Sequence, residues 1–484
     1  MNDSNDRRIR RESLSERVRS NPYPAVIWLG AGLALVLPEA GALLSFLLGL
    51  VPWGALAGAV PVPGQPTVAE FGRALADVPT LLSRDVIPNQ GYKVPGEGWH
   101  GTFMGLSPAL AWALRAGLVF GYVACWGLWA VHGYRLYRYT YRPAEWTPFD
   151  DTVDRFADHG WGLFGLAVVC LFLTFAVFAP AVSPTTAERN IYDRYEQSIT
   201  HYEDGQLREV SVGTANLDTV SQGIETRNVG VLTYDRYDRF HPFGTLPNGQ
   251  DLFMFMAAGA RVSLFIGLLS IGLSVVLAGG GALVSAYYRG RVDLGLVLAG
   301  DSIQAMPQLL VIILLSVVLS GTWIADLYNG GVLIALVFAG TGWPGLWRSI
   351  RGPAMQVARE SWVEAARGFG EPARVTMYRH ILPYVTGYLL VYASMILGGI
   401  VIGVAGLSFL GLGVTAPVPE WGRAISAGEP YVDSVSWHIA LIPGLLIVLV
   451  VTGFNALGDG VRDAIDPQSE SSESTVVASS GGGA

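Results

Sequence analysis

The chain is short of charged residues. Asp, Glu, Lys and Arg make up 14% of its 484 residues, against roughly 25% in an average soluble domain. Hydrophobic residues reach 51%, and the mean hydropathy is +0.40. This composition excludes an intrinsically disordered chain and argues against a soluble enzyme. It predicts a polytopic membrane protein.

Lysine is almost absent, because Lys93 is the only lysine among 31 basic residues. A P-loop needs a lysine directly after its glycine-rich turn to hold phosphates. The segment around Lys93, residues 90–95, does not have that spacing. We therefore expect no ATP site of this kind in the chain. We also expect no nucleic-acid partner, since the net charge is −8 and nucleic-acid binding needs a basic face.

Cysteine is equally scarce, and both copies, Cys125 and Cys170, stand inside apolar runs. Neither a disulfide framework nor a cysteine metal site follows from two such residues. The seven histidines are scattered, with no His-Glu-x-x-His pair. The sequence therefore predicts no metal, no cofactor and no catalytic residues, so the chain is expected not to be an enzyme.

Long apolar runs are what the sequence has instead. A helix needs about 20 apolar residues to cross the hydrocarbon core of a bilayer. The first run is interrupted by Pro38 and Glu39 and is either one tilted crossing or a re-entrant pair, and Met306-Pro307 predicts a kink in the fifth. The eight runs cover residues 25–60, 106–131, 161–182, 262–287, 296–319, 332–347, 385–410 and 439–455.

Arginine clusters set the expected orientation, since Lys and Arg are enriched in loops on the inner side of a membrane. Six arginines lie in residues 7–19, three in 135–142 and six in 348–379. All three clusters fall on one side if each run crosses once. The sequence thus predicts a multi-pass protein of the cell membrane with both termini cytoplasmic. Residues 183–250, with ten acidic residues and six arginines, are then an outer segment.

One inner loop carries a dense motif, EAARGFGEPARVTMYRHILP, at residues 364–383. Ser361 is placed to cap a first helix, with Glu364 three residues on as its capping-box partner. Gly370 ends that helix, a second helix follows, and Pro383 closes the element. A broken helix pair held between two spans is suited to docking a cytoplasmic partner.

This block resembles the EAA loop of ABC-importer permeases. The matching residues are Glu364, Ala365, Ala366, Gly370, Ile381, Leu382 and Pro383. Flanking segments resemble the second permease subunit of dipeptide/oligopeptide importers, and the resemblance covers about residues 240–467. These segments are 241–245, 259–264, 286–288, 407–413, 420–422 and 455–460. The chain departs from the family pattern after Thr245, where Gln250 stands in place of an arginine.

The resemblance implies an all-α, type I ABC-importer transmembrane fold of about six helices, here with two extra N-terminal spans and an outer loop domain. The expected parts are a cytoplasmic tail at 1–24, two extra spans with an inner linker at 25–150, the first helix of the permease core at 151–182, an extracytoplasmic loop domain at 183–250, the ABC transmembrane type-1 domain at 251–466 and a disordered cytoplasmic tail at 467–484.

The resemblance also implies partners. They are a sister permease that completes a heterodimer, two cytoplasmic ATPase subunits that bind the 361–383 loop, an extracytoplasmic substrate-binding protein and membrane lipid. In such an assembly the permease performs no bond chemistry. Binding of ATP by its partners shifts a bundle of spans between two arrangements.

Polar residues at membrane depth are candidates for function. Asp301 and Gln304 are three apart on one helix face. They either line the translocation path or contact the sister permease, or they lie in water at the inner membrane interface without a function in transport. Asn455 and Asp459 are four apart at the end of the last run, where they either have the same functions or fix that helix end.

The cargo stays open at this point. The resemblance implies di- or oligopeptides, and similar permeases import nickel or an oligosaccharide. An ion-driven secondary transporter is an alternative of another class. It calls for paired intramembrane carboxylates or an inverted repeat, and the sequence displays neither.

Overall fold

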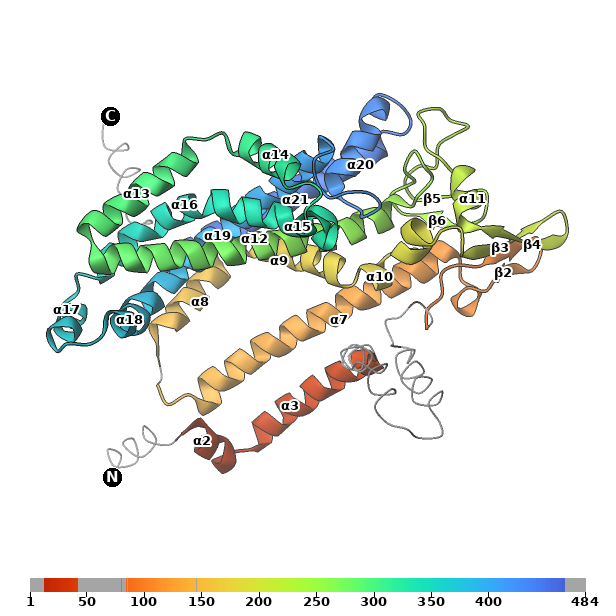
Figure 1. The fold of residues 1–484 in the computed structure, drawn as a ribbon. Coiled ribbons are helices and arrows are strands. Elements are labelled where there is room, and N and C mark those ends of the chain that lie inside the picture. The colour runs from red at the N-terminus through yellow and green to blue at the C-terminus, as the bar shows by residue number, and fades with distance from the viewer. Residues whose placement is uncertain (1–12, 42–79, 81–83, 85, 145, 466–484) are drawn as a thin grey trace, which may run out of the picture. The chain divides into compact units, whose positions relative to one another are not determined.

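The computed structural model describes residues 13–41, 80, 84, 86–144 and 146–465. This part of the chain is mostly helical (Figure 1). Six of its helices are long and apolar enough to cross a membrane, or up to eight if each of two bent pairs counts as one span. The predicted all-α polytopic class is confirmed. The chain divides into two compact units, which are described separately.

The first unit consists of Met1–Thr147, Phe178–Ala215 and Leu232–Pro242. Its helical elements are α2 (Leu14–Ser20), α3 (Tyr23–Val36), η1 (Leu37–Glu39), η2 (Phe103–Gly105), α7 (Pro108–Leu136), η3 (Tyr137–Tyr141), α10 (Ala179–Val182) and η4 (Glu188–Tyr192). Its strands form three antiparallel pairs: β1 (Tyr92–Val94) with β2 (Gly98–His100), β3 (Ser198–Glu203) with β4 (Gln206–Ser211), and β5 (Thr233–Tyr234) with β6 (Phe240–His241). The short helix α11 (Val212–Leu217) begins in this unit.

The β3–β4 hairpin is set by its turn. Glu203 pairs with Gln206, so only Asp204 and Gly205 connect the strands. Both have positive φ, 53° and 80°, as a two-residue hairpin turn with the right twist requires, and Asp-Gly is a preferred sequence for it. The ribbon pairs without slippage from Ser198 opposite Ser211.

A reciprocal pair of tryptophans joins α3 to α7. The indole N–H of Trp28 donates to the carbonyl of Trp129 at 3.1 Å, and that of Trp129 donates to the carbonyl of Trp28 at 2.9 Å. The rings stack with centroids 4.2 Å apart. Gly133 leaves room for them, because a Cβ there would lie 2.5 Å from Trp28. Helix α3 belongs to the first predicted run, whose remainder, 42–60, lies outside the described residues.

Two arginines hold α7 and the segment before it against α10 and the residue that follows α10. Arg115 of α7 is fully buried and donates to the carbonyls of Ala181 and Ser183 at 2.6 and 2.7 Å. Arg84 also donates to Ser183, at 2.8 Å. The side-chain oxygen of Asn89 accepts from Arg115 and Arg84 at 2.9 and 3.1 Å. A buried guanidinium costs free energy unless its donors are paired, and here the backbone supplies the partners.

The second unit consists of Pro148–Val177, Asn216–Val231 and Phe243–Ala484. Its helical elements are α8 (Pro148–Asp158), α9 (Gly160–Val177), α12 (Leu252–Tyr288), α13 (Gly290–Gln304), α14 (Gln308–Val318), α15 (Trp323–Asp326), η5 (Leu327–Gly330), α16 (Gly331–Val357), α17 (Ser361–Gly368), α18 (Ala373–Thr376), η6 (Met377–Ile381), α19 (Leu382–Phe409), α20 (Trp421–Gly428), η7 (Glu429–Tyr431) and α21 (His438–Ile465). Helix α12 packs on α16, α19 and α9, and α21 packs on α9 and α19.

Three helices of this unit extend beyond the apolar runs that predict them. Helix α12 starts at Leu252, ten residues before the predicted run 262–287. Asp251 caps it, because its carboxylate accepts from the N–H of Met254 at 2.7 Å. The runs predicted to end at residues 347 and 455 are each ten residues too short, since α16 continues to Val357 and α21 to Ile465.

The predicted run 296–319 is a broken pair of helices. Helices α13 and α14 are bent by 81° at residues 305–307. Pro307 has no N–H to donate to the preceding turn. The predicted kink at Met306-Pro307 is confirmed, and α13 begins earlier than predicted, at Gly290.

Glycines let α9 and α21 approach closely. A Cβ on Gly165 would lie 2.3 Å from the backbone nitrogen of Leu457, and a Cβ on Gly162 would lie 2.9 Å from the Cα of Gly460. Small residues that permit backbone contact are the usual means of packing helices where lipid removes the hydrophobic driving force. This seam joins the first and last helices of the second unit's bundle.

We expect Gly165→Ala to destabilise the protein by about 1–3 kcal/mol, the usual cost of overpacking, because the methyl group has to push α9 away from α21. Gly444→Ala on α21 is the matched control, since a Cβ there meets nothing within 4 Å. Thermal unfolding in detergent measures both variants. Equal melting temperatures would contradict the close approach.

Candidate functional site

The segment 361–383 has the predicted helix, turn and second helix. Helix α17 ends in a Schellman motif. The N–H of Gly370 donates to the carbonyl of Arg367 at 3.0 Å, and the N–H of Glu371 donates to the carbonyl of Ala366 at 3.1 Å. Gly370 has φ +81°, a left-handed conformation that costs other residues roughly 1–2 kcal/mol. The turn therefore explains the glycine of the motif.

The predicted start and end of this element are wrong. Glu360, not Ser361, is the N-cap of α17, and no side chain caps the helix, so the capping box is absent there. Just before α17, the guanidinium of Arg289 donates to the carbonyl of Ala358 at 2.9 Å. Pro383 does not close the element either. It lies in the first turn of α19, where a missing N–H costs nothing.

Helix α17 is fastened along one face. The guanidinium of Arg367 lies over the ring of Tyr287, 4.2 Å from its centroid, in cation–π geometry. The ring of Trp362 lies 5.8 Å from that of Tyr384, and Val363 is fully buried. These contacts connect α17 to the end of α12 and the start of α19.

Glu371 and His380 fasten the other half of the segment. His380 Nε2 lies 2.9 Å from a carboxylate oxygen of Glu371, and the hydroxyl of Thr376 donates to the same oxygen at 3.3 Å. The sequence does not predict this group, because a nine-residue spacing fits no helical repeat. The π turn η6 brings the ends together. An acid just after the turn glycine and a histidine before the closing Ile-Leu-Pro were the only signal.

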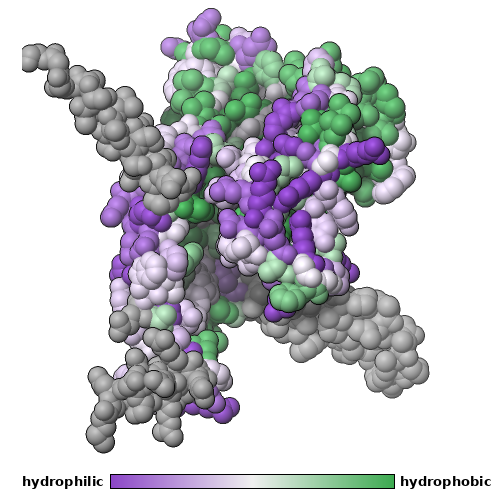
Figure 2. All heavy atoms as spheres, turned by 90° about the vertical axis from the view of Figure 1, so that its left-hand side faces the viewer, coloured by the Kyte–Doolittle hydropathy of each residue, from purple (hydrophilic) through white to green (hydrophobic). Residues whose placement is uncertain are grey.

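The motif residues differ in exposure. Glu364, Ala365, Gly370 and Pro383 are exposed, Ala366 and Leu382 are half-buried, and Ile381 is fully buried. Phe369 at the turn is 92% exposed and Tyr378 is 72% exposed. Aromatic side chains presented on a fixed frame are the usual anchors of protein interfaces. Figure 2 looks onto the end of the molecule where α17 and α18 lie in Figure 1, and hydrophilic side chains are prominent there.

Asp301 has a partner within its own chain. It pairs with Arg348 of α16, and both side chains are 54% exposed. Eight residues earlier on α13, Asp293 accepts from two nitrogens of Arg351, with the Nε bond at 2.6 Å. Two aspartate–arginine pairs thus lock α13 to α16.

Gln304 lies in the wall of a cavity of about 560 Å³ at the break between α13 and α14. The side-chain nitrogen of Gln308 donates to the hydroxyl of Thr341 in the same wall, at 3.1 Å. Asp301, one turn away, does not line the cavity. The other lining residues are Ser274, Ile303, Met306, Val311, Phe338, Gly342, Gly345, Ile396, Gly399 and Ile400.

Asn455 and Asp459 lie one turn apart on α21, where Asn455 is exposed and Asp459 is half-buried. Neither lines the cavity at Gln304. They do not end their helix, since it continues to Ile465. Beyond them, Asp463 lies 3.3 Å from His159, at the junction of α8 and α9.

Glu420 is a fully buried acid between α19 and α20. One carboxylate oxygen accepts from the N–H of Gly422 at 2.6 Å. Burial raises the pKa of Glu420 to about 7, although Ser408 and the first amides of α20 oppose this rise. A Cβ on Gly422 would lie 1.7 Å from the carbonyl oxygen of Ala405. Helix α20 is thus pressed onto α19 with a protonatable group at the contact.

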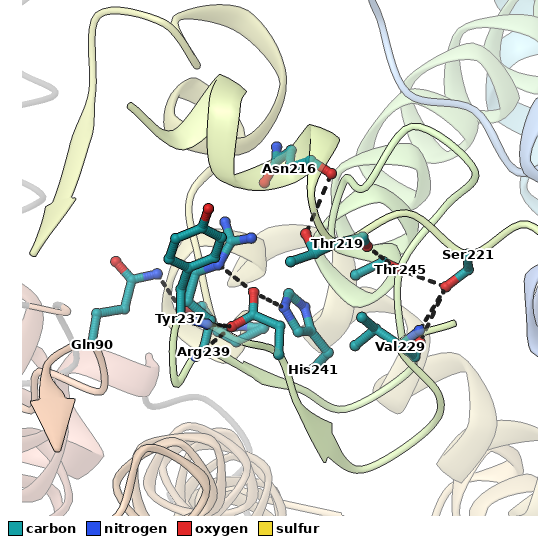
Figure 3. Close-up of polar contacts among 11 residues, drawn as sticks. Gln90, Asn216, Thr219, Ser221, Val229, Tyr237, Arg239, His241 and Thr245 are labelled. Carbon is teal, nitrogen blue, oxygen red and sulfur yellow. Dashed lines mark hydrogen bonds and ion pairs between the residues drawn. The ribbon is translucent and has the colours of Figure 1, made fainter. Parts of the chain in front are cut away.

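In the first unit, Asp235 organises the β5–β6 hairpin, whose residues Tyr237, Arg239 and His241 are labelled in Figure 3. One carboxylate oxygen accepts from the N–H groups of Tyr237 and Arg239 at 2.9 Å each. The other accepts from the guanidinium of Arg239 at 2.6 Å and lies 3.2 Å from the ring of His241. Burial alone would raise the pKa of Asp235, but Arg239 and His241 hold it well below its usual range. These contacts hold the hairpin turn together.

In the second unit, Thr245 joins several loops (Figure 3). Its hydroxyl donates to the carbonyl of Thr219 at 2.7 Å and shares a 2.8 Å hydrogen bond with the hydroxyl of Ser221. The ring of His438 lies 3.2 Å from the carbonyl of Thr245. The part of the chain that the structure describes has no group of three His, Cys, Asp or Glu side chains suited to a metal ion.

The helices of the second unit are similar to known transport proteins. Residues 270–470 match the family described as "binding-protein-dependent transport system inner membrane component". The dipeptide transport system permease protein DppC of Alkalihalophilus pseudofirmus is 33% identical over 231 residues, which are 48% of this chain and 73% of that protein. The chain belongs to this family. It is a permease of an ABC importer of the oligopeptide/dipeptide type, as its motifs predict.

Further matches extend the likeness toward the N-terminus of the permease. Residues 147–201 match the "N-terminal TM domain of oligopeptide transport permease C", a stretch that includes α8 and α9. The oligopeptide transport system permease protein OppC of Bacillus subtilis is 29% identical over 319 residues, 66% of this chain and 89% of that protein. The glutathione transport system permease protein GsiD of Escherichia coli O6:K15:H31 is 35% identical over 229 residues, 47% of this chain and 72% of that protein.

We expect α20 of the permease to loosen as the pH rises from about 5 to about 8. The folded pKa of Glu420 is about 7, above the ordinary 4.5. The stability that the neutral acid supports is therefore complete below the ordinary value and is lost as the pH rises through about 7. Hydrogen exchange of the α20 amides will accelerate beyond the intrinsic pH effect, and Glu420→Gln will abolish this excess. The exposed Glu429→Gln is the control and will retain it. Retention in Glu420→Gln would refute the assignment.

Proposed function

We propose that this permease is one of two membrane subunits of an importer for short peptides. It forms the translocation path with a sister permease and receives cargo from a substrate-binding protein outside the cell. Two separate ATPases inside the cell dock on residues 361–383 and drive the cycle. The permease itself catalyses no reaction.

The single observation that carries this proposal is the fastened, exposed turn at Gly370. The Arg367–Tyr287 and Glu371–His380 contacts hold the segment on both sides of that turn. A partner that grips Phe369 and Glu364 therefore cannot move the turn alone. It must move α17 with the ends of α12 and α19.

Helix α16 gives a route from the turn to the cavity. Only three residues, 358–360, separate its last residue, Val357, from the start of α17. The same helix holds α13 through Arg348 and Arg351, and α13 ends at the cavity wall. In this proposal, closure of the ATPases tilts α16 and α13 together and changes access to the cavity. The helices shift between two packed arrangements, and ATP binding by the ATPases favours one arrangement over the other.

Two observations favour peptides as cargo. The relatives reported above are named for oligopeptide, dipeptide and glutathione transport, and all three cargoes are peptides. The cavity at Gln304 is lined by neutral polar and apolar side chains, whereas a nickel ion prefers imidazole, carboxylate or thiolate ligands. Asp293 and Asp301 pair with arginines of α16, which is unlike the coupling carboxylates of an ion-driven transporter.

We place both termini in the cytoplasm. The arginine clusters at 7–19, 135–142 and 348–379 support this orientation. Residues 183–250 then face the binding protein. Asn455 and Asp459 remain candidates for contact with the sister permease.

We expect Gly370→Ala to uncouple transport. An alanine at φ +81° strains the turn and shifts Phe369, so association with the ATPases and peptide uptake should fall at least tenfold. Glu364→Ala should act in the same direction, because it removes an exposed charge of the docking face. Co-purification of the ATPases and uptake into vesicles measure both effects.

Gly368→Ala is the matched control for this turn. It lies two residues earlier in α17, and a Cβ there meets nothing within 4 Å. It should bind ATPases and transport as the native chain does. Normal uptake by Gly370→Ala and Glu364→Ala together would refute the docking assignment.

Cysteine labelling tests the orientation. After Cys125 and Cys170 are replaced by alanine, a membrane-impermeant thiol reagent should reach Leu207→Cys only from outside and Phe369→Cys only from inside. The native side chains at these positions are 54% and 92% exposed. Labelling of both cysteines from the same side would refute the proposed topology.

A further inference from the structure

The break between α13 and α14 is unusual backbone for a membrane. The two helices are long and apolar enough to form a membrane span only when they are taken together as a bent pair. Between them Pro307 lacks an N–H, and the N–H of Met306 reaches the carbonyl of Ile303 in a single tight turn at 3.3 Å. Non-helical backbone at membrane depth is tolerated only where protein buries it or where it lines a water-filled cavity. Here Met306 lines the 560 Å³ cavity.

Two primary amides flank this break, Gln304 at the end of α13 and Gln308 at the start of α14. Both side chains are exposed and both line the cavity. Apart from Gln308, α14 contains only one polar residue, Ser316. An amide facing hydrocarbon would lose its hydrogen bonds at a large cost. The two glutamines therefore point to a polar occupant of the cavity.

Hydrogen bonds within the chain fix the position of Gln308 in the cavity wall. The hydroxyl of Thr341 donates to the carbonyl of Val337 at 2.8 Å and accepts from the side-chain nitrogen of Gln308 at 3.1 Å. This chain of bonds orients the Gln308 amide. On the same face of α16, Gly345 lies beside Gln304, whose side-chain nitrogen would be in ordinary van der Waals contact, at 3.4 Å, with a Cβ at that position.

An apolar groove of about 340 Å³ adjoins the amide cavity. The two spaces share Ile303, Met306, Val311 and Thr341. The far part of the groove is lined by aliphatic side chains such as Leu315, Leu336 and Val337. One continuous surface thus presents neutral hydrogen-bonding groups next to an apolar pocket.

We propose that Gln304 and Gln308 form a substrate-contact site in the membrane path, which hydrogen-bonds main-chain amides of a passing peptide while the adjoining groove accepts an apolar side chain. This inference rests on the proposed function. A carboxamide offers two donors and an acceptor, which complements the N–H and carbonyl of a peptide bond. None of the residues that line the cavity is charged, so the site favours neutral peptide segments. The permease thereby adds selectivity of its own to that of the binding protein.

The test uses the complete importer, with its sister permease, ATPases and binding protein, in vesicles. The probes are trialanine and a trialanine N-methylated at both peptide bonds, each at a concentration that saturates the binding protein. The native complex should take up trialanine at least fivefold faster than the methylated peptide, which lacks both peptide-bond N–H donors. In Gln304→Leu/Gln308→Leu, trialanine uptake should fall at least tenfold and the preference should disappear, while ATPase co-purification is unchanged.

Ser302→Leu is the matched control. It makes the same polar-to-leucine change on α13 but does not line the cavity, and it should transport as the native chain does. A second measurement does not depend on the double variant. Met306→Cys, in the chain without Cys125 and Cys170, should react with a small thiol reagent, and trialanine should slow that reaction.

The outcomes are distinguishable. If the native complex takes up neither peptide, the proposed cargo is wrong and the site falls with it. If the native complex takes up trialanine and the double variant does so equally well, only this inference is overturned. If the double variant does not assemble, absence of trialanine protection at Met306→Cys overturns the inference, and protection supports it.

Discussion

The hydrocarbon of the membrane supplies no water to peptide groups, so each N–H and carbonyl must find its partner inside the protein. This constraint produces the long helices of both units. Where a helix begins or ends, its unpaired N–H and carbonyl groups need other partners. Asp251 starts α12 by supplying an acceptor for the N–H of Met254, and Gly370 ends α17 by letting two N–H groups turn back to the helix. The break at 305–307 lies between the two halves of a candidate span, which is bent there by 81°.

Helix α16 brings the functional elements of the second unit together. It contributes Thr341 to the cavity, Arg348 and Arg351 to the pairs with α13, and its last turn leads into α17. In the proposed importer, a ligand in the cavity and a partner at the exposed turn both act on this one helix. Such an arrangement links two distant sites without a long chain of side-chain rearrangements.

Much of this could be predicted from the sequence. Composition gives the class, the apolar runs locate most helices, and the motif at 364–383 gives the family. Gly370 and the kink at Met306-Pro307 are also predictable, because glycine and proline act through local backbone chemistry. These features depend on residues that are close in sequence.

The rest depends on contacts that a single sequence does not encode locally. The Glu371–His380 pair needs a π turn, and the Gln308–Thr341 bond joins residues 33 apart. Ser361 fails as a cap because the chain enters α17 one residue earlier than the capping-box spacing implies. The burial of Glu420, which shifts its pKa, depends on how closely α20 packs on α19. Helix ends were predicted too short because polar final turns stay helical after the apolar run is over.

Arg115 imposes an order on the biogenesis of the first unit. It is synthesised 66 residues before Ala181, whose carbonyl it binds, and at about 5–20 residues per second that gap lasts roughly 3–13 s. During this time the guanidinium of Arg115 lacks that acceptor. Arg115 is in the second turn of the helix, so its long side chain can keep the guanidinium in water at the membrane interface until then. The contacts that lock α7 in place therefore form only after α10 and Ser183 have been synthesised, later than α7 itself.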